Sequence, residues 1–287
     1  LALLLVALSV AVLVIELRGR GDATLHRLGS GASRRVRPVA LGPARIPAVL
    51  FCAGVVGIAL VLPVGVLTAW LLRSFGADLD LSGLAAAAIH SLTLGFWTAL
   101  IATMCALPIA TLLVRFPGAG ARAVERLTYL GYALPGLVVA LAFVAFGAGT
   151  PFYQTLSMLV AACVVRFLPE AISATRAALL QISPRLEEAA RGLGRSQLGA
   201  VLSVTAPLAR PGILAGAALV LLTAMKELPA TLLLSPTGWD TLAVEVWTAA
   251  NNAAYGQAAA PALILIAVAS VPMLLLAPRD RVQVHAP

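Results

Sequence analysis

The composition of this 287-residue chain excludes a water-soluble globular protein. Apolar residues make up 61% of it and charged residues 11%, and its mean hydropathy is +0.98. Soluble domains average about 45–50% apolar and about 25% charged residues, so lipid must be part of the solvent of this chain. The net charge of +8 does not indicate a nucleic-acid partner, because the basic residues lie in short segments between apolar runs, where membrane topology explains them.

Seven apolar runs are candidates to cross the hydrocarbon core as helices, which takes about 20 residues each. In chain order they are residues 1–17, 47–72, 84–114, 127–149, 152–172, 208–234 and 258–277. They predict an all-α fold, a polytopic membrane helical bundle with a six-span unit over residues 47–277. The short first run begins abruptly, without the basic flank of a signal peptide, so we interpret it as one extra, truncated helix that ends a preceding half.

Arginines mark the cytoplasmic side of this bundle. The polar segment 18–46, rich in Gly, Pro and Arg, is interpreted as a basic cytoplasmic linker, and residues 278–287 as a cytoplasmic tail. Nearly all other arginines fall in connections on the same side, so we expect a multi-pass protein of a bacterial inner membrane. Three cysteines lie inside apolar runs without metal-ligand spacing, and we expect small buried hydrophobes and no metal site. They are Cys52, Cys105 and Cys163.

Two charges lie four residues apart within the run 152–172. Arg166 and Glu170 could pair along one face of the helix. Because they fall near the predicted cytoplasmic end of this run, we interpret them as topological charges.

The long cytoplasmic connection that follows predicts a short helix, a turn and a second helical stretch. Ser183 is a suitable N-cap, and Pro184 suits the first turn. Glu187 and Glu188 come next, where the helix dipole favours negative charge, and Gly194 lies in the turn. A rigid helix held between two spans could transmit the movement of a cytoplasmic partner. The alternative is an amphipathic helix that lies on the membrane surface.

Residues 183–207 resemble the EAA signature of ABC importer permeases of type I, the inner-membrane components of binding-protein-dependent transport. In that signature Glu-Ala-Ala is followed after three residues by Gly, and later by an aliphatic residue and an aliphatic-Pro pair. The matching residues are Glu188, Ala189, Ala190, Gly194, Val204, Ala206 and Pro207. The resemblance implies that this helix is the coupling helix, which docks into a nucleotide-binding ATPase subunit.

The same resemblance implies the partners of the chain. They are two nucleotide-binding ATPase subunits that use ATP, a periplasmic or lipid-anchored substrate-binding protein, and a second permease half. No cofactor is expected on this chain itself. The residues expected to couple it to the ATPase are Glu187, Glu188, Ala189, Ala190, Gly194 and Pro207.

Two further segments resemble the same family. The stretch from Ser91 to Leu113 is similar to its second-span pattern, and that from Tyr132 to Phe143 to the third span of its ferric-iron branch. Because that branch often fuses two halves in one chain, the six-span unit is interpreted as the C-terminal half. The implied cargo is Fe(III), with thiamine, phosphonate, sulfate and polyamine as alternatives, since related permeases carry them on the same scaffold.

Charges in the run 208–234 predict a functional element inside the membrane. Lys226 and Glu227 each cost roughly 2.5–3.5 kcal/mol there on insertion scales, and Pro229 is expected to bend the helix. One interpretation places all three residues on the translocation pathway, where a carboxylate suits a hard trivalent cation. The run Lys-Glu-Leu-Pro-Ala-Thr is similar to ferric-iron permeases. The other interpretation is a structural ion pair with Arg166 or Glu170.

The long external connection, about residues 235–257, predicts a short amphipathic helix with Asp240 as its N-cap. Its aromatic residues fit an interfacial belt. Alternatively, the segment receives the loaded binding protein, with Asp240 and Glu245 supplying charge. The belt residues are Trp239, Trp247 and Tyr255.

Other classes of function lack their motifs. The sequence contains no GxxxxGK[ST] phosphate loop, so ATP hydrolysis requires a separate subunit. An ion-coupled secondary transporter remains the alternative, but only the run 208–234 carries a buried charge pair beside a proline, and the paired interrupted helices of that class are missing. A membrane enzyme is not supported, because the three histidines are scattered and no HExxH occurs, so no catalytic residues are expected.

Overall fold

The computed structural model describes residues 42–74 and 80–276. The predicted extra helix 1–17, the tail 278–287 and all but the end of the linker 18–46 lie outside these residues. Within the described ranges the chain is built from helices and contains no strand, which confirms the predicted all-α fold.

The helices follow one another closely along the chain. In order they are α2 (Arg45–Val56), α3 (Leu62–Arg73), α4 (Leu81–Arg115), α5 (Ala119–Ala133), α6 (Gly136–Gly147), α7 (Leu156–Leu180), α8 (Pro184–Gly192), α9 (Gln197–Ala200), α10 (Ala206–Met225), α11 (Pro229–Leu234), α12 (Leu242–Asn251) and α13 (Tyr255–Leu276). Among the described residues, 5 helical stretches are long and apolar enough to cross a membrane, and the bent pair of α5 and α6 would be the sixth.

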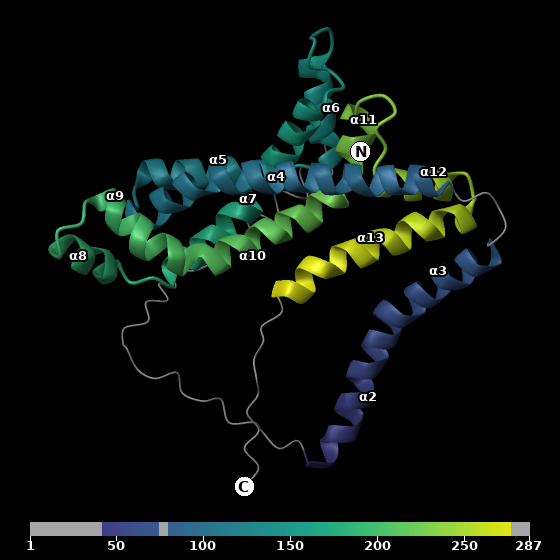
Figure 1. Ribbon diagram of the computed structural model, residues 1–287, viewed down its shortest axis with the longest axis horizontal. Helices are drawn as coiled ribbons and strands as arrows, with labels where there is room; N and C mark the ends of the chain where they lie inside the picture. The colour runs from purple at the N-terminus through teal and green to yellow at the C-terminus, as the bar shows by residue number, and fades with distance from the viewer. Residues whose placement is uncertain (1–41, 75–79, 277–287) are drawn as a thin grey trace.

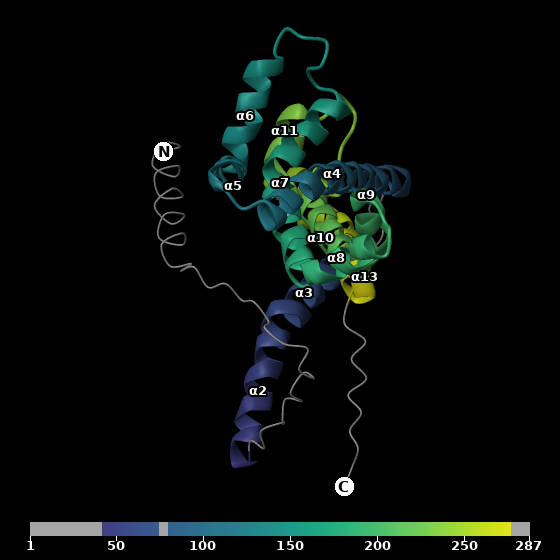
Figure 2. The ribbon, with the colours of Figure 1, turned by 90° about the vertical axis from the view of Figure 1, so that its left-hand side faces the viewer.

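Three long helices, α4, α7 and α10, pack against one another and form the core of the bundle (Figure 1). α13 contacts this core and packs on α3, while α8 and α9 lie at one end of the bundle and α12 at the other. α6 and α11 pack on each other and project from the side, as Figure 2 also shows. Large side chains that are at most 1% exposed fill the core, among them Leu94, Leu159, Ile172, Val220 and Met225.

Glycines on α10 let it approach α7 closely. A Cβ atom at Gly212 would lie 2.6 Å from Cβ of Ala178, and one at Gly216 would overlap Cβ of Ala174. Small residues four apart on facing helices bring the two backbones together, which is how membrane helices associate without a hydrophobic driving force.

Two spans contain a π-helical turn directly before a proline. The turn Gly57–Val61 comes before Pro63, and the turn Val201–Thr205 comes before Pro207. In each case the backbone N–H of the residue before the proline donates to the carbonyl five residues back. Because proline has no N–H and its ring crowds the carbonyl four residues back, the wider turn keeps the span continuous.

The predicted continuous span 127–149 is wrong, because two helices occupy it. α5 ends at Ala133 and α6 starts at Gly136, and their axes differ by 100°. Leu134 between them is extended, with φ −77° and ψ 136°. A following proline favours that conformation, and Pro135 cannot donate a hydrogen bond back into α5.

The predicted span 208–234 is also interrupted, and the break comes before the proline that was expected to bend it. α10 ends at Met225, and the N–H groups of Lys226 and Glu227 donate to carbonyls three residues back, over 3.3 and 3.1 Å. α11 then begins at Pro229, a position where the missing N–H leaves no intrahelical bond unmade.

The first described span, residues 42–73, has none of its tested window buried inside the chain. Its apolar side chains are therefore open to lipid or to another protein. Cys52 lies on this span and is exposed, and Cys105 on α4 is exposed as well. The expectation of buried cysteines holds only for Cys163, because the lipid-facing surface of a bundle accepts apolar residues as readily as its interior does.

The contact between α7 and α10 can be tested by adding one methyl group. We expect G216A to lower the unfolding temperature of the purified protein in detergent, because overpacking costs roughly 1–3 kcal/mol. G65A on α3 is the matched control, since a Cβ there meets no atom within 4 Å. Equal effects of the two substitutions would contradict this account of the helix contact.

Candidate functional site

The predicted cytoplasmic helix is α8, which lies at the end of the bundle where α4 ends and α10 begins (Figure 1). Arginines gather at this end, which the positive-inside rule assigns to the cytoplasm. They include Arg115, Arg122, Arg126, Arg176, Arg185, Arg191, Arg195 and Arg210. Ser183 holds the N-cap position with an extended backbone and Pro184 is the first helical residue, as predicted, but the Ser183 side chain makes no capping hydrogen bond.

Gly194 ends α8 in a conformation that few residues other than glycine adopt. Its φ is +87°, and its N–H donates to the carbonyl of Arg191 over 3.0 Å. The N–H of Arg195 donates to the carbonyl of Ala190 over 3.2 Å. This pair of bonds is the Schellman motif, which satisfies the last carbonyls of a helix and turns the chain sharply.

The two adjacent glutamates of α8 face different surroundings. Glu187 is 20% exposed, and its Oε1 accepts hydrogen bonds from Nη2 of Arg115 over 2.7 Å and from the hydroxyl of Thr205 over 2.5 Å. Arg115 is the last residue of α4, and Thr205 ends the π-helical turn before α10. Glu187 therefore fastens α8 to two core helices, whereas Glu188 is exposed.

The other residues that match the EAA signature are likewise partly buried and partly exposed. Ala190 is buried against the bundle and Ala189 is exposed, and Pro207 is the second residue of α10. Leu186 and Leu193 are 45% and 87% exposed. The outward surface of this end, which we call the α8 face, therefore combines apolar, acidic and basic side chains, namely Leu186, Leu193, Glu188, Arg185 and Arg191.

The second group of predicted residues lies at the break between α10 and α11. Glu227 is only 5% exposed, and its Oε1 accepts from Nη1 of Arg166 over 2.6 Å and from the backbone N–H of Ala230 over 3.4 Å. Of the two ion-pair partners that the sequence suggested, Arg166 and Glu170, the structure shows Arg166. Lys226 is exposed, and Pro229 starts α11.

Arg166 also reaches the other helix break. Its guanidinium lies against Gly136, the first residue of α6, so closely that a Cβ atom there would overlap it. The interpretation of Arg166 as a charge near the cytoplasmic end of a span is wrong, because α7 continues to Leu180 and Arg166 lies near its middle. The predicted pair with Glu170 is absent as well: Glu170 accepts from Thr223 over 3.3 Å instead.

The external segment forms α12, but its N-cap is Thr241, whose hydroxyl accepts from the N–H of Val244 over 3.4 Å. The prediction of Asp240 as the cap is therefore wrong by one residue. The carbonyl of Asp240 instead lies 2.9 Å from Nδ1 of His90 on α4, and the His90 ring stacks on Trp239 with centroids 4.6 Å apart. These contacts tie the external connection to the core.

Glu245 lies in an acidic environment at this external end. Partial burial raises the pKa of Glu245, and the charges of Asp240 and Asp80 raise it further. In contrast, hydrogen bonds from the Ser82 hydroxyl and from the backbone lower the pKa of Asp80, which caps α4. Asp80, Asp240 and Glu245 therefore gather negative charge at this end of the bundle.

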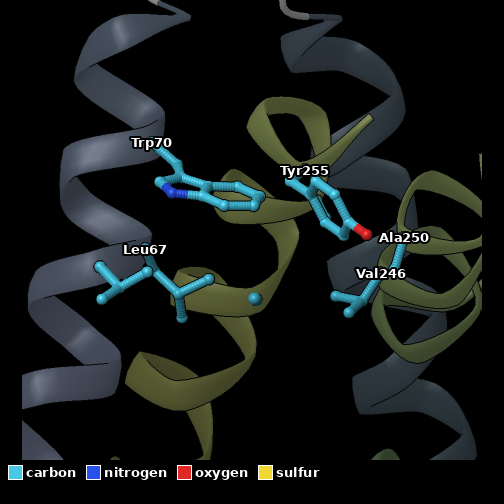
Figure 3. Close-up of a pocket in the computed structure, with 8 residues that line it drawn as sticks. Leu67, Trp70, Val246, Ala250 and Tyr255 are labelled. Carbon is cyan, nitrogen blue, oxygen red and sulfur yellow. The ribbon is translucent and has the colours of Figure 1, made fainter. Parts of the chain in front are cut away.

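A cavity of about 250 Å³ lies between α3, α12 and α13. Figure 3 shows Trp70 and Tyr255 side by side in its lining, and their rings are in edge-to-face contact, with centroids 4.6 Å apart and planes at 64°. Leu67 and Val246 also line it. Because its lining is almost wholly apolar, this cavity offers no ligands for a charged cargo.

Sequence reasoning did not single out Arg115, Thr205 or Gly136, each of which contacts a predicted site residue. In the sequence Arg115 is only one of the many arginines that mark the cytoplasmic side. A signal existed for Gly136, because a glycine directly after a proline inside an apolar run marks a probable turn. No local signal marks Thr205.

A bundle of membrane-spanning helices with a short helix held at its arginine-rich end defines a class, that of polytopic helical membrane proteins. Residues 100–279 match the family described as "Binding-protein-dependent transport system inner membrane component". This chain belongs to that family. It is therefore an inner-membrane transport component rather than an enzyme.

Relatives in the family differ in cargo. The chain is 33% identical over 282 residues to the "Fe(3+)-transport system permease protein FbpB 2" of Haemophilus influenzae, a match that covers 96% of this chain and 56% of that protein. The chain thus spans little more than half of that relative's length. It is 31% identical over 192 residues to the "Putative 2-aminoethylphosphonate transport system permease protein PhnV" of Salmonella typhimurium, covering 66% of this chain and 72% of the relative.

Solved structures share the fold. A chain of a bacterial alginate ABC transporter in complex with a pentasaccharide-bound periplasmic protein superposes with a TM-score of 0.64 at 19% identity, covering 80% of this chain and 92% of that chain. A chain of the MetNI methionine ABC transporter superposes with a TM-score of 0.56 at 20% identity, covering 67% and 92%. The predicted ABC permease fold is confirmed.

The Schellman end of α8 can be tested through Gly194. We expect G194A to destabilise the end of α8 by roughly 1–2 kcal/mol, the cost of a left-handed conformation for a residue with a Cβ. The measurement is hydrogen exchange at the amides of α8 and the following turn, which should accelerate. G192A is the matched control, because Gly192 lies in the helix with open space around it, and alanine there should slow exchange or leave it unchanged.

Proposed function

We propose that this chain is the permease part of an ATP-driven, binding-protein-dependent ABC importer, and that α8 is its coupling helix. The observation that carries the proposal is the α8 face, which stands free at the arginine-rich end while Glu187 anchors the helix from behind. Such a face suits a groove on a cytoplasmic partner, because exposed leucines supply burial and Glu188 supplies a charge at its rim. Membership in the family supports the same partner.

The anchoring of α8 suits transmission of force. Hydrogen bonds to an ionised carboxylate are roughly twice as strong as neutral ones, and Glu187 receives two of them from different core helices. A push on α8 would therefore move the end of α4 and the start of α10 together. ATP is bound and hydrolysed by two separate nucleotide-binding subunits in this proposal, since the sequence lacks a phosphate loop.

Fe(III) is the cargo that we propose. The relative from Haemophilus influenzae that is named for Fe(3+) transport aligns with 96% of this chain, more than the relative named for 2-aminoethylphosphonate does. Glu227 supplies a hard carboxylate ligand near the bundle interior. Phosphonate is the second candidate, because the chain is also 31% identical to that relative.

The remaining partners follow from the same proposal. A periplasmic or lipid-anchored binding protein would dock on the external end, where Asp240 and Glu245 lie close together. A second permease half would complete the pathway, and the uncovered span 42–73 offers it an apolar surface. The pathway itself would run past Lys226 and Glu227 at the helix break.

Substitutions of the two glutamates of α8 can distinguish docking of the ATPase subunit from anchoring of α8 to the bundle. We expect E188A to abolish co-purification of the ATPase subunit while leaving the unfolding temperature of the permease unchanged, because Glu188 touches only the partner. E187A should instead lower the unfolding temperature, since it leaves Arg115 without its carboxylate. Retention of the ATPase by E188A, and by charge reversal at the same position, would contradict the docking role of the α8 face.

The role of Glu227 is tested by transport. We expect E227A to reduce ATP-dependent uptake of ferric iron into cells or proteoliposomes by at least about tenfold, because the pathway loses its buried carboxylate. Glu125, which pairs with Arg176 outside the break, is the control, and E125A should transport normally. Full uptake by E227A at normal membrane abundance would remove Glu227 from the mechanism, and competition by 2-aminoethylphosphonate would identify the other cargo.

A further inference from the structure

One side chain connects the two helix breaks of the membrane domain. Arg166 on α7 pairs with Glu227 at the break between α10 and α11, and its guanidinium fills the space beside Gly136 at the bend between α5 and α6. The helices that start at these breaks, α6 and α11, pack on each other and project together from the bundle (Figures 1 and 2). The ion pair therefore lies at the base of this pair of helices.

We propose that the Arg166–Glu227 pair is a latch that holds the pathway closed, and that transport requires Arg166 to exchange Glu227 for Glu170. The proposal rests on the translocation role given above to the break between α10 and α11. It makes Arg166 a positioning residue, which acts on cargo by controlling access to Glu227.

The energetics favour a latch with two defined positions. Glu227 is 5% exposed and Arg166 28%, so the pair is largely removed from solvent. Separating such charges without replacement leaves an uncompensated charge in a low-dielectric interior, which is strongly unfavourable. A simple break of the pair is thus excluded as a low-energy step, and opening needs new partners for both charges.

The replacement partner for Arg166 is already in place. Glu170 lies one helical turn beyond Arg166 on α7, and its Oε2 is buried without a hydrogen-bond partner in the described part of the chain. Its Oε1 makes only a 3.3 Å contact with Thr223. An Arg and a Glu four residues apart on one helix can pair, so a change of side-chain rotamer would carry the guanidinium to Glu170.

The exchange leaves Glu227 available to a cation. Lys226 beside it is exposed and forms no ion pair within the described residues, while Arg166 and Glu170 neutralise each other on α7. A trivalent cation arriving from the binding protein would then replace the guanidinium as the partner of Glu227. Cargo binding and latch opening would stabilise each other, which is the condition for a ligand to shift a two-state equilibrium.

Cys163 provides a reporter of the latch that needs neither ATP nor cargo. It lies three residues before Arg166 on α7 and is 0% exposed. Substituting the exposed Cys52 and Cys105 by alanine leaves Cys163 as the only thiol of the 3 in the sequence. Its rate of modification by a small maleimide in membranes then measures how often the latch opens.

The experiment compares four variants of the full chain in that background. We expect R166Q and E227Q to increase the modification rate of Cys163 by at least about tenfold, because the closed state loses its ion pair, whereas R166K should stay close to the parent because it keeps the charge. R176Q is the matched control, since Arg176 also lies on α7 and pairs over 2.6 Å with Glu125 on α5, but touches neither break.

Each outcome decides the proposal. An unchanged modification rate of Cys163 in both R166Q and E227Q overturns the latch. Modification of R166K as fast as that of R166Q overturns it as well, because the shape of the arginine side chain and not its charge would then hold the pathway closed. Should R166Q fail to reach the membrane, E227Q carries the test, since glutamine matches glutamate in size. If the parent chain shows normal ATP-driven uptake while the modification rate of Cys163 is unchanged in R166Q and E227Q, only the latch is contradicted. If the parent chain shows no uptake, the proposed function is contradicted, and the labelling result remains valid.

Discussion

Lipid cannot satisfy a backbone hydrogen bond, and this constraint decides where the chain can leave the helical conformation. An unpaired N–H or C=O in hydrocarbon costs several kcal/mol, so irregular backbone is tolerated only where protein groups replace the lost bonds. At the break between α10 and α11 the side chains of Glu227 and Thr231 supply them. The carboxylate of Glu227 accepts from the N–H of Ala230, and its carbonyl accepts from the hydroxyl of Thr231 over 2.7 Å. The charge that seemed expensive in the sequence is therefore part of what permits the break.

The same constraint separates two kinds of proline at helix ends and widened turns. Pro63 and Pro207 follow π-helical turns, in which wider hydrogen bonds replace the missing one and the span continues. Pro135 is the N-cap of α6, and Pro229 is the first residue of α11. Only this second kind lies next to Arg166 or Glu227, so these two charged side chains are found where a helix stops and not where it only widens.

The sequence predicts the spans well and the breaks poorly, for a physical reason. Hydropathy reports how many residues can lie in lipid, and the runs 47–72, 84–114 and 258–277 fall on spans of the structure. It does not report continuity, because α4 contains Pro108 and α7 contains Pro169 without interruption. What distinguishes an interrupted helix is the tertiary partner that satisfies its broken end.

The hydrogen-bond partners of the site residues could not be predicted either, because they too depend on tertiary contacts. Glu187 and Glu188 are neighbours with identical side chains, and only the fold shows that one faces Arg115, 72 residues earlier, while the other is exposed. The motif around them was recognisable in the sequence because its glycine has a local role: Gly194 adopts a left-handed conformation that ends the helix. Arg166 and Glu227 are 61 residues apart, and the sequence could name them as alternatives but not choose.

The connection between the two candidate sites lies in α7 and α10, which the cytoplasmic loop joins. α7 carries Arg166 and leads into α8, while α10 starts beside the Thr205 that holds Glu187 and ends next to Glu227. Both halves of the ion pair are thus mounted on helices that a docked partner would move through α8. Gly212 and Gly216 clamp the two helices together in their cytoplasmic half, and the ion pair lies roughly 15 Å further along, at about 1.5 Å per residue. The close contact at Gly212 and Gly216 would keep α7 and α10 from sliding past each other. If α8 rotated, the two helices would therefore tilt about this contact, and Arg166 and Glu227 would move relative to each other. In the proposed importer, this arrangement would let a short cytoplasmic helix act on a single ion pair inside the membrane without any continuous change in the packing between them.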